Sequence, residues 1–277
     1  MKILLTLLLI LFTSLAPAAN LDLRCGVVLP YPVGGLPDVY TRAMERLNSD
    51  IYMVDHKPGA LGTLAMIHMA QHPNFTMLAS PMMFGETNPN KNIQVELIRF
   101  IIGYDILMVT NSGITLQQIL TQKINIGITS IGSPMHIVAL QLKELNPLIE
   151  IIPTGGDSKT LTLLLDKSLD VYISGSYNLS KWITSYKIQP ILTVPSGGSF
   201  KKDKIVLNNY SAVGMWRHRD APPEVKLMLD KCINTVVISP TWPAEINAMG
   251  ASPMNLNTEE SGKMLNEYIT ILRKYGL

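Results

Sequence analysis

A glycine-rich segment at residues 30–38 carries the residue types best suited to hold a ligand. It reads Pro-Tyr-Pro-Val-Gly-Gly-Leu-Pro-Asp and joins an apolar run to a helical pattern. Gly34 and Gly35 can adopt a positive φ and let a ligand approach the backbone closely. Pro37 suits a first helical position, where free N–H groups and the helix dipole attract an anion. Asp38 could accept a hydrogen bond from a ligand amine or hydroxyl, or it could simply stabilise the helix N-terminus.

Three further segments place glycine, serine or threonine where an apolar run ends and a helical pattern begins, at residues 57–63, 129–134 and 153–157. In open α/β sheets, ligands bind outside the carboxyl ends of the strands. One helix N-terminus contributes only about 0.3–1 kcal/mol toward an anion, whereas micromolar binding needs about 8 kcal/mol. Several helix termini must therefore converge from two sides, which a clamp of two lobes would achieve.

Short apolar runs alternating with helical patterns would position these segments. Strands are expected at residues 25–29, 51–54, 76–79, 106–109, 124–128, 149–152, 171–174, 190–194 and 212–216. Helices are expected at residues 37–47, 61–70, 116–120, 135–145, 159–166 and 177–185. Strands with continuous apolar faces between helices indicate parallel α/β layers.

The C-terminal quarter is predicted to be nearly all helix. One helix opens at Pro222 and a shorter one at Pro240, and the last follows Asn257, whose Asn-x-x-Glu spacing suits a capping box. Because no linker or repeat is visible, any two lobes must be interwoven. We expect lobe 1 at residues 20–107 plus 218–277 and lobe 2 at residues 108–217.

The N-terminus predicts export. Lys2, an apolar run at residues 3–12 and the segment Ala-Pro-Ala-Ala at 16–19 are typical of a secretory signal peptide. A membrane anchor fits poorly, because about 20 apolar residues are needed to span a bilayer. We expect residues 1–18 to be removed and the mature protein to be periplasmic.

Composition limits the partners. Of 277 residues, 47% are hydrophobic and 16% charged, which indicates a well-buried chain. The net charge of +2 argues against a nucleic-acid partner. Cys25 and Cys232 could form a disulfide or remain buried thiols, and the sequence leaves both open. The 15 methionines are better explained by core packing than by metal binding.

Motifs in the same order along the whole mature chain resemble the substrate-binding (Bug) family of tripartite tricarboxylate transporters. The two most specific motifs are Gly34-Gly35-x-x-Asp38 with Arg42, and Val54-x-x-Lys57-Pro58-Gly59-Ala60-x-Gly62. Weaker ones are Phe75-Thr76-x-Leu78, Gly132-Ser133-Pro134-x-His136, the run at 161–170, Ala221-Pro222-Pro223, and Thr258-Glu259-Glu260 through Tyr275-Gly276.

The resemblance implies a type 2 periplasmic-binding-protein fold, with two α/β lobes joined by crossover strands. It implies a carboxylate ligand held by backbone amides, hydroxyls and water, no cofactor and no metal. Membrane transporter subunits would be the partners, and the protein would be a monomer. The ligand-binding residues that the resemblance implies are Tyr31, Gly34, Gly35 and Asp38 in the first lobe, and Ser130, Gly132 and Ser133 in the second. Ser80, Thr154 and Gly155 are further candidate ligand-binding residues.

The chain departs from the family pattern at four places. His56 stands where the family usually has asparagine, and Leu61 interrupts a usual glycine pair. Asn74 stands near the end of what is normally an Asp-Gly-Tyr-Thr run in the family. The segment Pro153-Thr154-Gly155 replaces a common Tyr-Lys-Gly. These departures leave the fold prediction intact and put the usual ligand in doubt.

The competing classes of protein are an enzyme and a sensor. An enzyme is disfavoured, because His68 and His72 lack the glutamate of a H-E-x-x-H site, and Ser199-x-x-Lys202 lacks the companion motifs of serine acyltransferases. A periplasmic sensor signalling to a membrane receptor would use the same binding chemistry and stays open. For a clamp, we expect a hinge near residues 106–109 and 213–216 and closure on the ligand.

Overall fold

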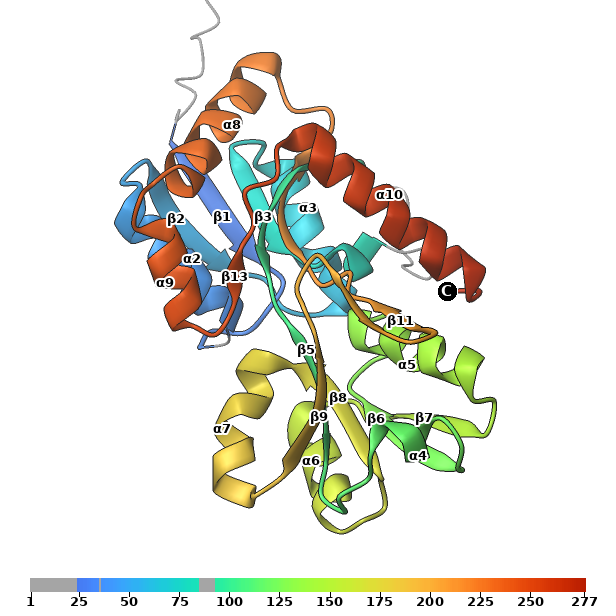
Figure 1. Ribbon diagram of the computed structural model, residues 1–277. Coiled ribbons are helices and arrows are strands. Elements are labelled where there is room, and N and C mark those ends of the chain that lie inside the picture. Colours follow the sequence, from blue (N-terminus) through green and yellow to red (C-terminus); the bar gives the residue numbers. More distant parts are fainter. Residues whose placement is uncertain (1–23, 35, 85–92) are drawn as a thin grey trace, which may run out of the picture.

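The computed structural model describes residues 24–34, 36–84 and 93–277 and shows an α/β fold of two units, one above the other in Figure 1. The predicted signal peptide and Gly35 lie outside the described residues. Among the helices of the described residues, none is long and apolar enough to cross a bilayer.

The upper unit, lobe 1, is built on a six-stranded sheet of order β13-β4-β12-β3-β1-β2. Strands β1, β2 and β3 are parallel, whereas β12 is antiparallel to both of its neighbours and β13 is antiparallel to β4. The bounds are β1 Cys25–Leu29, β2 Ile51–His56, β3 Phe75–Ala79, β4 Val95–Gly103, β12 Val213–His218 and β13 Ser252–Pro253.

Helices cover both faces of this sheet. One core cluster joins β1 to α2, α8 and α9, and another joins β1 and β3 to α3 and α10. Burial on both faces explains why every residue of β1 and β3 is buried and nearly all are apolar, rather than alternating with exposed polar residues. The bounds are α2 Leu36–Leu47, α3 Thr63–Gln71, α8 Pro223–Val237, α9 Trp242–Ala248 and α10 Thr258–Lys274, with 3-10 turns η1 Ala60–Gly62 and η2 Pro81–Phe84.

The lower unit, lobe 2, is built on a five-stranded sheet of order β7-β6-β8-β5-β9. Its strands are β5 Ile106–Thr110, β6 Ile124–Ile128, β7 Ile149–Pro153, β8 Val171–Gly175 and β9 Gln189–Val194. Its helices are α4 Leu116–Ile119, α5 Pro134–Leu145, α6 Asp157–Leu165 and α7 Ser176–Tyr186. A hairpin of β10 Ser199–Lys202 and β11 Ile205–Asn208 packs Ile205 and Leu207 into the same core.

The predicted elements are confirmed to within a few residues, but four strands were missed: β4, β10, β11 and β13. The apolar run of β4 contains Arg99, whose guanidinium is buried and donates from Nε to the carbonyl of Leu256 at 2.8 Å. A charged residue inside the strand interrupts the apolar run from which strands are predicted. The expected parallel pairing is confirmed for β1, β2 and β3 and for β6, β7 and β8. Both sheets are nevertheless mixed, because β5 is antiparallel to β8 and β9, as β12 is to β3 and β4.

The chain passes between the lobes at Tyr104 and again at residues 209–212. The side-chain amide of Asn209 donates to the carbonyls of Tyr104 at 2.9 Å and Val194 at 3.0 Å, so the two crossovers lie side by side. The boundaries predicted from sequence fall inside β5 and β12. We propose that one lobe ends and the other begins in the two crossovers, just before β5 and β12. The hinge would lie in the same two segments.

Cys25 and Cys232 form a disulfide, which settles the question that the sequence left open. It ties β1 to α8 across 207 residues of sequence, and both cysteines are almost wholly buried. A cross-link over so long a loop restricts the unfolded chain strongly. The disulfide therefore joins the first strand of lobe 1 to the helix that follows the return from lobe 2.

Replacing both cysteines by serine should lower the free energy of unfolding by about 2–5 kcal/mol. Denaturant unfolding of the variant and of wild type measures the difference. Reduction of unfolded wild-type protein is the matched control, because it removes the cross-link without changing a residue. An unchanged unfolding midpoint in both experiments would contradict this account.

Candidate functional site

The candidate site in lobe 1 lies at the carboxyl ends of β1, β2 and β3. Because these strands are parallel, their ends at Leu29, His56 and Ala79 lie at one edge of the sheet. The chain after β1 leads into α2, that after β2 into η1 and α3, and that after β3 into η2. The predicted residues Tyr31, Gly34, Asp38 and Ser80 all belong to this edge.

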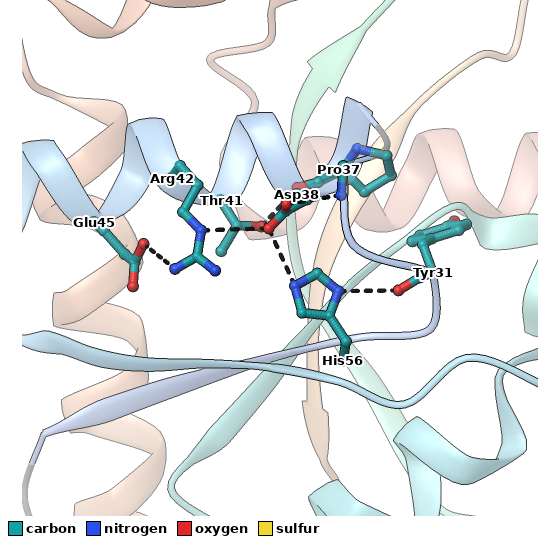
Figure 2. A network of polar contacts seen from close by, with 8 residues as sticks. Tyr31, Pro37, Asp38, Thr41, Arg42, Glu45 and His56 are labelled. Carbon is teal, nitrogen blue, oxygen red and sulfur yellow. Dashed lines mark hydrogen bonds and ion pairs between the residues drawn. The ribbon is translucent and has the colours of Figure 1, made fainter.

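The carboxylate of Asp38 holds this edge together (Figure 2). The backbone N–H of Gly34, at a φ of +84°, donates to Oδ2 at 3.0 Å. The Nε2 of His56 lies 3.1 Å from Oδ1, and the Nε of Arg42 lies 3.4 Å from the same oxygen. Only 8% of Asp38 is exposed. Both of its oxygens therefore already have partners, which favours the structural one of the two roles expected from the sequence. That Asp38 also accepts from a ligand amine or hydroxyl stays a prediction.

His56 bridges Asp38 to the loop after β1. Its Nδ1 lies 3.0 Å from the carbonyl oxygen of Tyr31. A carbonyl and a carboxylate lie on opposite sides of the ring, so these contacts fix its position and orientation. The sequence pattern gave no signal for this contact, which joins residues 18 positions apart.

The surroundings of Asp38 stabilise its charged form. Burial alone would raise the pKa of its carboxyl group, but the Gly34 N–H, the charges of His56 and Arg42 and the His56 hydrogen bond outweigh burial. The pKa of Asp38 therefore lies below its usual range. At neutral pH the side chain is ionised and anchors the Gly34 turn.

Tyr31 and Ser80 form a second contact at the same edge. The backbone N–H of Ser80 donates to the phenol oxygen of Tyr31 at 3.4 Å. Burial raises the pKa of Tyr31 to about 12, so the phenol keeps its proton at neutral pH. The hydroxyl oxygen of Ser80 is buried and has no hydrogen-bond partner among the described residues. An unpaired buried hydroxyl costs free energy, which makes Ser80 a candidate donor to a ligand.

In lobe 2, β6, β7 and β8 are parallel and end at the edge that faces lobe 1 (Figure 1). The hydroxyl of Ser133 caps α5, accepting from the N–H of His136 at 3.1 Å and donating to the carbonyl of Ser130 at 2.8 Å. Its single proton is therefore used within the loop. The expected donation from Ser133 to a ligand would require breaking this bond, so the role of Ser133 is better explained as shaping the loop.

Gly132 occupies the same loop at a φ of +77°. Its N–H donates to the Nδ1 of His136 at 3.0 Å, and burial lowers the pKa of His136, which is consistent with a neutral ring that accepts there. Apart from the chain neighbours of each glycine, no atom of the described residues lies within 4 Å of a Cβ built on Gly132, Gly34 or Gly155. The backbone at these three predicted positions is therefore open to close approach.

Thr154 and Gly155 follow β7. The hydroxyl of Thr154 lies 3.1 Å from the carbonyl of Ile128 and also contacts Thr160. The N–H of Gly155 donates to the carbonyl of Thr129 at 3.0 Å, so the loops after β6 and β7 are joined. At the start of α6, Asp157 accepts from the hydroxyls of Tyr172 and Ser174, the latter at 2.9 Å.

The two lobes touch around this region. The phenol of Tyr268, in α10 of lobe 1, donates to the carbonyl of Gly132 in lobe 2 at 2.6 Å. Tyr104, at the crossover, packs edge-on against Tyr177 of α7 with ring centres 5.4 Å apart. The hydroxyl of Ser176 lies 3.3 Å from the carbonyl of Gly250. Ala79 at the end of β3 pairs with Gly214, just after one crossover, and the N–H of Ser176 after β8 donates to the carbonyl of Asp105 in the other. The loops at the carboxyl ends of both sheets therefore lie at this boundary, and sequence reasoning missed the three tyrosines.

Two other features include none of the residues predicted to bind a ligand. The rings of His68 and His72 stack at 4.2 Å with a 24° tilt, an arrangement unlike that of a chelating pair. A cavity of about 640 Å³ lies between the β9–β10 connection and the start of α10, where its lining includes Ser196, Asn208 and Lys263.

Comparison with known proteins identifies the fold. No family model matches the sequence, and no curated protein matches it. The structure is similar to a TctC solute-binding protein from Polaromonas, with 16% identity, a TM-score of 0.66 and coverage of 91% of this chain and 98% of that one. A protein of R. palustris solved with adipate is 16% identical with a TM-score of 0.70, and the match covers 91% of this chain and 97% of that one. The periplasmic binding protein BugD is 19% identical with a TM-score of 0.65, and the match again covers 91% of this chain and 97% of that one.

The fold is that of a two-lobed solute-binding protein. The α/β architecture predicted from the sequence is confirmed, as is the resemblance in fold to the TctC and Bug proteins. In this fold, the glycine turn of Asp38 and the cap of Ser133 lie at strand-to-helix junctions on opposite lobes.

Replacing Asp38 by asparagine should destabilise the protein in a pH-dependent way. The folded-state pKa of Asp38 is lowered, so its stabilisation is present above the unfolded-state pKa of about 4 and is lost as pH falls through the folded-state pKa. The free energy of unfolding should fall by roughly 1–3 kcal/mol at pH 7, with little difference near pH 2.

Urea unfolding at pH 7, 4 and 2 measures this difference. Asp203→Asn is the matched control, because Asp203 lies at an exposed turn between β10 and β11. A penalty for Asp38→Asn that is the same at every pH would mean that the charge of Asp38 does not hold the turn.

Proposed function

We propose that this protein is a periplasmic solute-binding protein that captures a small carboxylated organic molecule and releases it unchanged. It would serve a tripartite tricarboxylate-type transporter as a member of the TctC/Bug family, with the transporter's membrane subunits as its partners. The observation that carries the proposal is that strand-to-helix loops with open glycine backbone face each other from both lobes. The backbone there lets a ligand approach closely, and the buried hydroxyl of Ser80, which has no partner among the described residues, supplies a donor to an anion at the lobe 1 edge.

The similar structures support this proposal. One of them was solved with adipate, a dicarboxylate, and another is described as a TctC solute-binding protein. The two loops of the present chain lie on opposite lobes, so a ligand between them would contact both. Binding that differs between open and closed lobes would shift the protein toward the closed form. A membrane partner could then recognise the closed shape.

A thermal-shift screen of the mature protein tests the proposal. A ligand present at 100 times its dissociation constant adds about 2.7 kcal/mol to stability, which should raise the melting temperature of a protein of this size by about 5 °C or more. The panel should contain dicarboxylates, tricarboxylates and aromatic acids. Sodium chloride at equal ionic strength is the control, because it excludes a general salt effect.

We expect at least one acid to raise the melting temperature in a saturable way. Gly34→Val should abolish that shift, because valine is strained at positive φ and its side chain would occupy the space that the ligand approaches. Gly113→Val is the matched control, at a φ of +74° in the loop between β5 and α4. Absence of any shift across the panel would count against the proposed function.

A further inference from the structure

One hydrogen bond in the candidate ligand loop of lobe 2 comes from the other lobe. Residues 129–133, here called the Gly132 loop, join β6 to α5. Two of its hydrogen bonds, from the Ser133 hydroxyl and from the Gly132 N–H, stay within residues 130–136. The carbonyl of Gly132 accepts instead from the phenol of Tyr268 in α10, at 2.6 Å. Among the described residues, this is the hydrogen bond that ties the loop to lobe 1.

Tyr268 is fixed in place by a cluster that crosses the lobe boundary. Only 1% of Tyr268 is exposed, and its ring lies in an apolar cluster with Leu272 of α10 and Ile137 of α5 (Figure 1). Tyr210, in the second crossover, packs against this ring with ring centres 6.3 Å apart. A carbonyl only accepts hydrogen bonds, and burial raises the pKa of Tyr268, so the phenol is a protonated donor at neutral pH. The hydroxyl is therefore held where it meets the Gly132 loop.

Little packing holds the peptide group that follows Gly132. This glycine has a φ of +77°, and apart from its chain neighbours no atom of the described residues lies within 4 Å of a Cβ built on it. In a planar trans peptide, the carbonyl of Gly132 and the N–H of Ser133 point in opposite directions. The phenol of Tyr268 therefore orients both groups at the start of α5. Without it, the loop backbone that a ligand approaches would be held by the local bonds alone.

We propose that Tyr268 of lobe 1 is a positioning residue for ligand binding, whose hydroxyl sets the conformation in which the Gly132 loop of lobe 2 receives a ligand. The inference rests on the proposed function and adds to it a residue outside the predicted ligand loops. Because the hydrogen bond joins the two lobes, the loop has its complete binding conformation only while α10 stays against α5. Ligand capture by lobe 2 is thereby coupled to the position of lobe 1.

Calorimetry on the mature wild-type protein and on Tyr268→Phe tests the proposal. Succinate, adipate, citrate and benzoate are the probes, and the acid that binds wild type most tightly is used for the variants. Phenylalanine keeps the ring that fills the cluster and removes only the donor. The dissociation constant should therefore rise at least tenfold, which corresponds to about 1.4 kcal/mol.

Tyr210→Phe is the matched control for this substitution. It removes a phenol hydroxyl from the same cluster, and among the described residues this hydroxyl makes no hydrogen bond. The dissociation constant of Tyr210→Phe should equal that of wild type.

Hydrogen exchange separates a positioning role from general stabilisation. The N–H groups of Gly132 and His136 are bonded within residues 132–136, so their exchange reports the shape of the loop. In ligand-free Tyr268→Phe, a peptide covering residues 129–136 should exchange faster than in wild type. Peptides covering β7 and β8, in the same lobe, should keep their wild-type rates. A residue that merely stabilised the fold would raise exchange in these strands as well.

Each outcome has a distinct meaning. If Tyr268→Phe binds the probe as tightly as wild type, or if Tyr210→Phe weakens binding equally, the proposal is overturned while the proposed function stands. Faster exchange throughout β7 and β8 would also overturn it, because the hydroxyl would then stabilise the whole lobe. If Tyr268→Phe does not fold by circular dichroism, the hydroxyl serves folding and the proposal is wrong. If none of the four acids binds wild type, both the proposal and the proposed function fail.

Discussion

The contact of one buried carboxylate with three separate parts of the chain fixes the geometry of the lobe 1 edge. Asp38 joins the Gly34 turn, helix α2 and the end of β2. A turn at positive φ has few contacts of its own, and its Gly34 N–H would otherwise be left for water or a ligand. Asp38 therefore gives shape to the glycine loop, and both of its oxygens are engaged in doing so. At the same edge, the buried hydroxyl of Ser80 has no partner among the described residues.

Lobe 2 is organised by the same need to satisfy loop atoms, but with neutral groups. Ser133 caps α5, and the neutral ring of His136 holds the N–H of Gly132. The carbonyl of Gly132 accepts from Tyr268 of lobe 1, so α10 reaches across to the very loop that would bind the ligand. Farther along α10, Lys274 pairs with Glu144 of α5 at 2.6 Å. Any movement between the lobes must therefore involve α10 as well as the two crossovers.

The sequence predicted most of the framework, because continuous apolar runs and helix caps are local signals. Residues 25–29 and 124–128 became strands with the predicted bounds, and Asn257 caps α10 as expected. The site was predicted less well. Glycines at strand ends identified the loops. The contact of His56 with Asp38 and the hydrogen bond from the Ser133 hydroxyl to the carbonyl of Ser130 depend instead on tertiary contacts and side-chain geometry. Strand β4 was missed because buried Arg99 interrupts its apolar pattern.

The central claim is that one ligand contacts strand-to-helix loops of both lobes at once. Hydrogen exchange followed by mass spectrometry, with and without a saturating acid from the thermal screen, tests it most directly. The account predicts slower exchange in peptides covering residues 30–38 of lobe 1 and residues 129–136 and 153–160 of lobe 2. Protection confined to one lobe, or found instead around Ser196, Asn208 and Lys263 at the separate cavity, would contradict it.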